Sequence, residues 1–293
     1  MTNPALDPRR HAFRPDLAAA TLRGRVEAAR YADGVPMQVV HGATPLWSRP
    51  DTSRGWDSQL LYGETARVYE EKDGFAWVQA ERDAYVGYVP AGALSPDVAA
   101  STHRVSVPGT FIYADADAKA LTGLHLSLNS LVCVAEAGQS FARLAGGGFV
   151  PVRHIAGLNA FAADFVAVAE RLVGAPYVWG GRTRAGLDCS GLVQTAMHAA
   201  GLDCPRDSDM QMAELGTTVA QPGDLAGLQR GDLVFWNGHV GILTDAAALL
   251  HANAHHMAVA AEPLDEAVER IARSGAAITA IRRIEPRGAQ RAG

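Results

Sequence analysis

Two segments in the first half of the sequence resemble each other and end alike. "GETARVYEEKDGFAWVQ" leads to GYVP at 87–90, and "LNSLVCVAEAGQSFARLA" leads to GFVP at 148–151. From residue 36 to residue 157 the chain consists of short β-like runs separated by turn residues. A repeat of this kind predicts one small all-β module that is present twice.

The sequence changes character after residue 158. Apolar residues at helical spacing predict a helix over 161–172, and a second amphipathic helix runs from Cys189 to Gly201. The strand candidates "GDLVFW", "HVGILTD", "ALLHAN" and "AITAIRRI" follow, with the helix "PLDEAVERIARSG" before the last. Helices followed by an antiparallel sheet predict an α+β domain. The expected division is an arm at 1–33, β modules at 34–98 and 99–157, the α+β domain at 158–285 and a tail at 286–293.

Composition excludes several classes of function. The 26 Lys and Arg against 31 Asp and Glu give a net charge of -5 without a basic block, so nucleic acid is not an expected partner. The N-terminal sequence is polar, and nothing approaches a membrane span, so we expect a cytoplasmic protein with no membrane partner. Cys133, Cys189 and Cys204 show no CxxC spacing, which favours a reducing compartment and permits a free reactive thiol.

Cys189 lies where a glycine-rich loop turns into the second helix. The thiolate is the nucleophilic form of cysteine, and unpaired N–H groups at a helix start favour it. We therefore expect this position, with Asp188 as N-cap, to lower the pKa of Cys189. The same N–H groups could stabilise an oxyanion. The alternative is a cysteine that only packs in the core.

Two histidines flank a predicted hairpin. His239 begins one strand and His251 ends the next, and a turn over 244–246 would centre the hairpin on residue 245. The two side chains would then lie directly opposite each other on one face, with Cβ atoms about 5 Å apart. One imidazole could deprotonate the thiol while the other orients it.

The motifs of the second half resemble a known family. "PYVWGGRTRAGLDCSGLV", "PRDSDMQ", "GDLVFW", "HVGI" and "HAN" are similar in order and spacing to NlpC/p60 cysteine peptidases of the papain-like superfamily, over about residues 160 to 285. Each β module resembles the bacterial SH3-like (SH3b) barrel. The resemblance implies an α+β, papain-like peptidase domain preceded by two small all-β SH3-like barrels. It makes Cys189 the nucleophile, His239 the base and His251 the orienting residue, with Tyr177 beside the nucleophile at the oxyanion or substrate.

The resemblance also implies a substrate. Such enzymes cut murein stem peptides between γ-D-Glu and the following L-diamino acid, diaminopimelate or lysine. A subgroup with two SH3-like modules recognises a free N-terminal L-Ala, which suits cytoplasmic recycling of cell-wall peptides. A buried ammonium demands carboxylate partners. The expected substrate contacts are Asp207 with Ser208, Glu64 and Tyr85 of the first module, and Asp188 and Ser190 beside the nucleophile.

Three other interpretations stay open. Zinc could use His239, His251, His255, His256 and a cysteine, but no HExxH motif is present, so we expect neither metal nor cofactor. A non-catalytic peptide-binding protein would have no reason to keep Cys189 and both histidines. An acyltransferase or amidase could use the same acyl-thioester, because a fold does not fix the acceptor.

Overall fold

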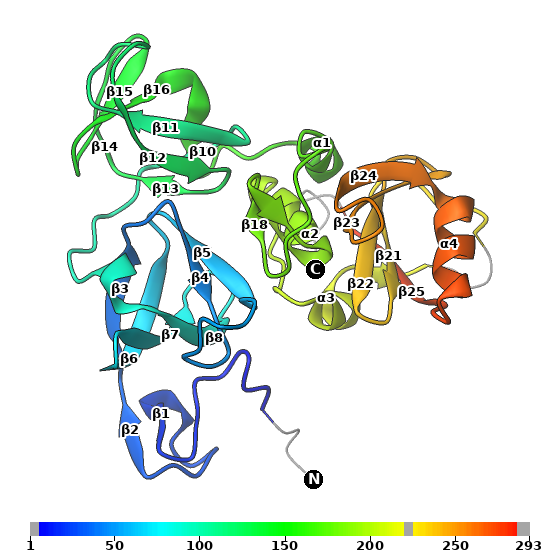
Figure 1. Cartoon of the computed structure of the whole chain (residues 1–293), viewed down its shortest axis with the longest axis horizontal. Coiled ribbons are helices and arrows are strands. Elements are labelled where there is room, and N and C mark those ends of the chain that lie inside the picture. Colours follow the sequence, from blue (N-terminus) through cyan, green and yellow to red (C-terminus); the bar gives the residue numbers. More distant parts are fainter. Residues whose placement is uncertain (1–5, 220–224, 286–293) are drawn as a thin grey trace. The chain divides into compact units, whose positions relative to one another are not determined.

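The computed structural model describes residues 6–219 and 225–285. The chain forms two compact units, Met1–Leu158 and Asn159–Gly293 (Figure 1). The expected tail at 286–293 lies outside the described residues, as do the first five residues of the expected arm. Among the described residues, no helix combines the length and the apolar composition needed to cross a bilayer.

The first β module is a small barrel-like arrangement of short strands. Its strands are β3 (Val35–Val39), β4 (Ala43–Leu46), β5 (Ser58–Leu61), β6 (Thr65–Lys72), β7 (Phe75–Ala80), β8 (Val86–Pro90) and β9 (Leu94–Ser95). They form a sheet in the order β8-β7-β6-β3-β9 and a separate β4-β5 hairpin. Alternate residues such as Val68, Val78 and Val89 point inward and form the core.

The arm is part of the first unit. It contains β1 (Leu17–Ala19), the 3-10 turn η1 (Ala20–Leu22) and β2 (Arg30–Ala32), and β1 pairs in parallel with β2. Leu17 and Leu22 share a buried cluster with Trp77 and Val86 of the module. The arm therefore covers apolar residues that the strands of the module would otherwise leave exposed.

The second β module repeats this plan. Its strands are β10 (His103–Val105), β11 (Gly109–Tyr113), β12 (Thr122–Ser127), β13 (Leu131–Val132), β14 (Val134–Ala137), β15 (Phe141–Leu144), β16 (Phe149–Pro151) and β17 (Ile155–Gly157). The sheets run β12-β11-β16-β15-β14 and β13-β10-β17. In both modules a three-strand meander ends at the shared Val-Pro, a 3-10 turn follows (η2, Ala91–Ala93, and η3, Val152–His154), and a short strand returns to the first strand. The sequence repeat thus corresponds to a repeated meander, 3-10 turn and returning strand, although the first strand joins the meander sheet only in the first module.

The second unit is an α+β domain, as predicted. It contains α1 (Phe165–Glu170), β18 (Arg182–Thr183), β19 (Gly186–Leu187), α2 (Cys189–Ala199), α3 (Ser208–Glu214), β20 (Thr217–Thr218), β21 (Asp232–Trp236), β22 (His239–Leu243), β23 (Ala248–Asn253), β24 (Ala258–Pro263), α4 (Leu264–Arg273) and β25 (Ile278–Arg283). An antiparallel sheet runs β20-β25-β21-β22-β23-β24. The helix α2 packs against β22 and β23, and Figure 1 shows α4 on the other side of the sheet.

Two elements of this unit differ from expectation. The first helix begins at Phe165 and not at residue 161, because the Asp164 side chain accepts a hydrogen bond from the Val166 N–H at 2.8 Å and caps the helix there. Strand β24 was not predicted. It pairs with β23 along its whole length and carries Glu262.

Candidate active site

Cys189 is the first residue of α2, as the sequence predicted. Asp188 is the N-cap, and its Oδ1 accepts a hydrogen bond from the Gly191 N–H at 2.6 Å. Its Oδ2 accepts one from the Gly180 N–H at 2.8 Å, which ties the glycine-rich loop to the helix start. The backbone of Val240 hydrogen-bonds the thiol, so the sulfur lies next to the residue that follows His239.

Arg206 is bonded to two residues at the start of this helix, and this contact was not predicted from the sequence. Its side chain is 1% exposed, and Nη2 and Nη1 donate to the two carboxylate oxygens of Asp188 at 2.7 and 3.1 Å. Nη1 also donates to Ser190 Oγ at 2.8 Å. Asp188 and Ser190, which we expected to contact substrate, are therefore buried and bonded within the protein. The arginine of "PRDSDMQ" was the available signal, but its partner lies 18 residues away.

The expected lowering of the Cys189 pKa does not occur. Burial raises the pKa of the thiol to about 12, and the negative charge of Asp188 acts in the same direction. The backbone groups of Val240 and Ser190, and then the charge of Arg206, lower the pKa but do not prevail. The helix start favours the thiolate, but the desolvation of a nearly inaccessible sulfur outweighs it. At neutral pH, Cys189 is a thiol.

The two histidines meet, although the predicted register is wrong. Ile242 pairs with Leu250 and Leu243 with Leu249, so the hairpin is centred one residue later than expected and His239 is not directly opposite His251. A slip of two positions in the pairing keeps both side chains on the same face. The rings meet diagonally, with His239 Nε2 2.8 Å from His251 Nδ1.

A glutamate continues this contact. His251 Nε2 lies 2.6 Å from Glu262 Oε1, and Glu262 also forms an ion pair with Arg270 of α4. We call His239, His251 and Glu262 the histidine–glutamate relay. Glu262 was missed because β24 was missed, although an acid in an otherwise apolar strand was a usable signal.

The relay fixes the tautomers of both rings. Burial raises the pKa of Glu262, but the hydrogen bond from His251 and the charge of Arg270 prevail and lower it, so Glu262 is ionised and only accepts. His251 Nε2 must then donate. Burial lowers the pKa of His251, so the ring is neutral and its Nδ1 accepts from His239 Nε2–H. The lone pair of His239 is left on Nδ1.

His239 is also neutral. Burial lowers its pKa to about 3, and positive charge on His251 and Arg270 would act in the same direction. A neutral imidazole is the form that can accept a proton from a thiol. Cys189 and His239 are therefore both uncharged at neutral pH, the first as a thiol and the second as an imidazole that can accept a proton.

Tyr177 lies near the cysteine. Its backbone N–H donates to the Met257 carbonyl at 2.9 Å. Burial raises the pKa of its phenol to about 12, and the negative charges of Cys189 and Asp188 add to this, which shows that the hydroxyl lies within electrostatic reach of both. As a phenol, Tyr177 keeps a proton to donate.

The remaining expected contacts lie in two places. Asp207 is the N-cap residue of α3, Ser208 is its first residue, and both are half-buried. Glu64 and Tyr85 belong to the first unit. The Glu64 side chain is buried and accepts from the Leu61 N–H at 2.9 Å, and Tyr85 is part of the module core. That Glu64 and Tyr85 wall the substrate pocket stays a prediction.

One group of metal-type ligands occurs among the described residues. Atoms of His251, His256 and Glu262 lie within 4.8 Å of one another. This is not the zinc set that the sequence suggested, since His239 and His255 are not members. Both ring nitrogens of His251 are already engaged by the relay, so an ion would have to displace His239 or Glu262. The donors fit a hydrogen-bonded relay better than a metal site.

Comparison with known proteins gives two family matches. Residues 174–271 match the NlpC/P60 family, and residues 46–94 match the bacterial dipeptidyl-peptidase Sh3 domain. The first range contains Cys189 and the whole relay. The second β module lies outside both ranges.

Individual relatives agree with these matches. A Mycobacterium tuberculosis protein named "Probable endopeptidase" is 39% identical over 103 residues, which is 34% of this chain but only 26% of that protein. The gamma-D-glutamyl-L-lysine dipeptidyl-peptidase of Bacillus subtilis is 26% identical over 220 residues, 66% of this chain and 71% of that protein. The crystal structure of an NlpC/P60 family protein from Bacillus cereus has a TM-score of 0.72 at 20% identity and covers 86% of this chain and 100% of its own. That likeness shows a shared fold.

Proposed function

Because the chain contains an NlpC/P60 domain behind a bacterial dipeptidyl-peptidase Sh3 domain, we propose that it is a cysteine peptidase with Cys189 as the nucleophile. The observation that carries the proposal is the relay of His239, His251 and Glu262 in the domain that holds a buried cysteine at a helix start. A protein that only binds peptides gains nothing from two neutral histidines with fixed tautomers. The arrangement is that of nucleophile, base and orienting group.

The proposed mechanism starts from the neutral pair. His239 Nδ1 takes the thiol proton as Sγ attacks the carbonyl carbon of the scissile amide. The N–H groups at the start of α2 and the Tyr177 hydroxyl stabilise the oxyanion. His239 then gives the proton to the leaving nitrogen, the C–N bond breaks and a thioester remains. Water attacks the thioester with His239 again as base, and the carboxylic product and the thiol are released.

The substrate that we propose is a murein stem peptide with a free N-terminal L-Ala, cut between γ-D-Glu and the L-diamino acid. The name of the Bacillus subtilis relative supports this bond. A free amine in a closed site needs a carboxylate, and within the second unit Asp207 is the group that we assign to it. Peptides of this kind arise from cell-wall turnover, so we assign the reaction to peptide recycling in the cytoplasm.

An acyltransferase or amidase stays the second candidate, because the thioester can pass to an amine as well as to water. The two outcomes differ only in the acceptor. Adding a free amine to the assay and searching for a new amide product distinguishes them from hydrolysis.

The test is a defined tripeptide, L-Ala-γ-D-Glu-meso-diaminopimelate, with release of the free diamino acid as the readout. We expect release by the wild-type protein, none by Cys189→Ala, loss after thiol alkylation and no loss with a chelator. The N-acetylated tripeptide should be a poor substrate. No release from a folded protein, or equal activity of Cys189→Ala, would refute the proposal. In cells, Cys189→Ala should cause the tripeptide to accumulate.

A further inference from the structure

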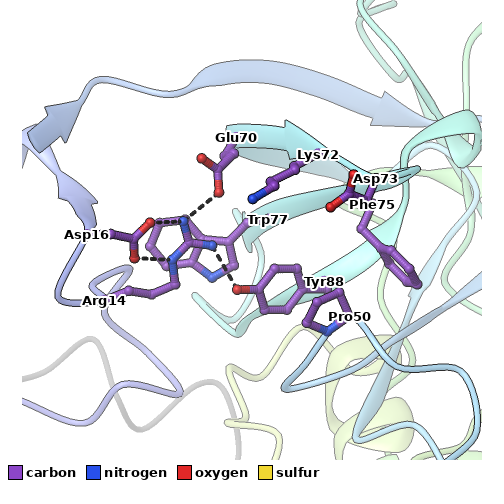
Figure 2. Close-up of a pocket in the computed structure, with 9 residues that line it drawn as sticks. All are labelled: Arg14, Asp16, Pro50, Glu70, Lys72, Asp73, Phe75, Trp77 and Tyr88. Atoms are coloured by element: carbon purple, nitrogen blue, oxygen red, sulfur yellow. Dashed lines mark hydrogen bonds and ion pairs between the residues drawn. The ribbon is translucent and has the colours of Figure 1, made fainter.

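The first unit contains a pocket of about 470 Å³ that shares no residue with the candidate active site (Figure 2). It lies where the arm meets strands β6, β7 and β8. The lining residues are Arg14, Asp16, Pro50, Glu70, Lys72, Asp73, Phe75, Trp77 and Tyr88. Its volume lies in the usual range of small-ligand sites, about 300–1,000 Å³.

The strand register explains why these side chains share one face. Lys72 pairs with Phe75, Glu70 with Trp77, and Trp77 with Tyr88. Cross-strand partners lie side by side on the same face of a sheet. Asp73 and Gly74 form the two-residue turn between β6 and β7. Their φ angles are 52° and 82°, and a type I′ hairpin turn requires positive φ at both positions. The result is an aromatic sheet face with charged residues at the hairpin end.

Arg14 forms a fixed wall of the pocket. Its guanidinium lies 4.3 Å from the centre of the Trp77 ring. It donates to Glu70 at 2.5 Å, to Asp16 at 2.8 Å and to the Tyr88 hydroxyl at 2.8 Å, and Figure 2 shows these bonds converging on it. Arg30 adds a second ion pair to Glu70. Two arginines therefore neutralise the two carboxylates of this wall.

Lys72 and Asp73 differ from these charged residues in their lack of a partner within the described part of the chain. Among residues 6–219 and 225–285, neither side chain has an ion-pair or hydrogen-bond partner. They are adjacent in sequence, both line the pocket, and Figure 2 shows them on the same side of it, above Phe75 and Tyr88. Lys72 is also unusual in composition, because Lys72 and Lys119 are the only lysines in a chain with many arginines. The pocket thus offers one free positive and one free negative group beside an aromatic surface.

We propose that this pocket binds a small zwitterion, an amino acid or short peptide with both ends free. Its carboxylate pairs with Lys72, its ammonium pairs with Asp73, and its apolar part lies against Phe75 and Tyr88. A plain anion such as phosphate meets repulsion from Asp73, and a plain cation meets repulsion from Lys72. The proposal does not depend on peptidase activity.

Amine-reactive labelling tests the site directly, because the two lysines report independently. The full-length Cys189→Ala protein is treated with a limiting acylating reagent, with and without the dipeptide L-Ala-L-Leu, and modification is read by mass spectrometry. Because the free amine of the dipeptide also consumes reagent, the readout is the ratio of Lys72 to Lys119 labelling, which we expect the dipeptide to lower several-fold. The N-acetyl and C-terminal amide forms of the dipeptide should change this ratio little. An unchanged ratio with dipeptide, or an equal change with a blocked form, would overturn the proposal.

Variants supply the second test. Lys72→Gln and Asp73→Asn should each weaken dipeptide binding by calorimetry about tenfold, since each removes one charge-assisted contact, whereas Lys119→Gln should not. Asparagine also suits the left-handed backbone of Asp73. Hydrolysis of the tripeptide by Lys72→Gln should match wild type. Unchanged dipeptide affinity in both variants, or loss of hydrolysis in folded Lys72→Gln, would contradict a separate zwitterion site.

Discussion

Glu262→Gln removes one negative charge from the end of the histidine–glutamate relay while it keeps the size of the side chain and one acceptor oxygen. In the native protein the carboxylate can only accept, and this forces His251 to donate through Nε2 at 2.6 Å. An amide can present either its oxygen or its NH₂ group to His251. The variant therefore weakens the preference for the tautomer that leaves the lone pair of His239 on Nδ1.

The size of the effect follows from hydrogen-bond energies. A bond to a charged acceptor contributes about 1.5–3 kcal/mol and a neutral one about 0.5–1.5 kcal/mol, so the substitution costs about 1–1.5 kcal/mol. Since 1.36 kcal/mol corresponds to tenfold in rate, kcat should fall about tenfold. KM should change little, because Glu262 acts on His239 only through His251 and is not among the proposed substrate contacts. Glu262→Ala loses the acceptor entirely, so kcat should fall about 10- to 150-fold.

The assay is tripeptide hydrolysis over a range of pH, with urea unfolding of each variant. The carboxylate of Glu262 raises the pKa of both His239 and His251, so the neutral amide should move the acidic limb of kcat/KM to lower pH. A purely structural role would not move that limb. The control is Glu269→Gln, because Glu269 is exposed on the same helix as Arg270 and pairs with Arg273 at 3.6 Å. If Glu262→Gln has the kcat and pH profile of Glu269→Gln, the relay does not position the base.

The wild-type kcat/KM should stay level as the pH falls through 6.5, because the pKa of His239 is lowered to about 3 and the base stays neutral; an acidic limb near 6.5 would contradict this. Both relay histidines have pKa values below those of the unfolded chain, so as the pH falls the unfolded chain binds protons before the folded protein does. Urea unfolding should therefore show that the free energy of unfolding is full above about pH 6.5 and declines at lower pH. Arg206→Met leaves the Asp188 charge buried without its ion partner and should lower the free energy of unfolding by about 3–5 kcal/mol, whereas Asp188→Asn with Arg206→Met should recover part of the loss; no recovery would argue against the pairing. In Gly191→Ala the new Cβ would lie 2.1 Å from the Gly181 carbonyl oxygen, so we expect a loss of about 1–3 kcal/mol in urea unfolding, with Gly92→Ala, where the added Cβ has open space, as the control.

The sequence could predict the features that depend on local pattern. The helix start at Cys189, its cap Asp188 and the contact of His239 with His251 are all found. The predicted histidine contact is confirmed despite the wrong register, because a shift of two residues in the pairing leaves both side chains on the same face of the sheet. The hairpin turn extends to residue 247, where Asp245 Oδ1 accepts from the Ala247 N–H at 2.8 Å, and turn length of this kind is set by one side chain.

The features that failed depend on packing. Arg206 reaches Asp188 from 18 residues away, and Glu262 reaches His251 from a strand that had no strong pattern. The pKa of Cys189 failed for the same reason, because burial by the surrounding fold outweighs the helix start beneath the sulfur. Periodicity locates elements along a chain. It does not say how completely the finished fold excludes water from one atom.

The protonated sulfur of Cys189 has a consequence for chemical damage. Peroxides and most electrophiles react with thiolates and hardly with thiols, so this cysteine should resist oxidation to sulfenic acid while no peptide is bound. In the proposed mechanism the proton leaves only as Sγ attacks the peptide, and the sulfur is then held in a thioester. Alkylating reagents should therefore inactivate the protein slowly, and faster as the pH rises and more of the sulfur is deprotonated.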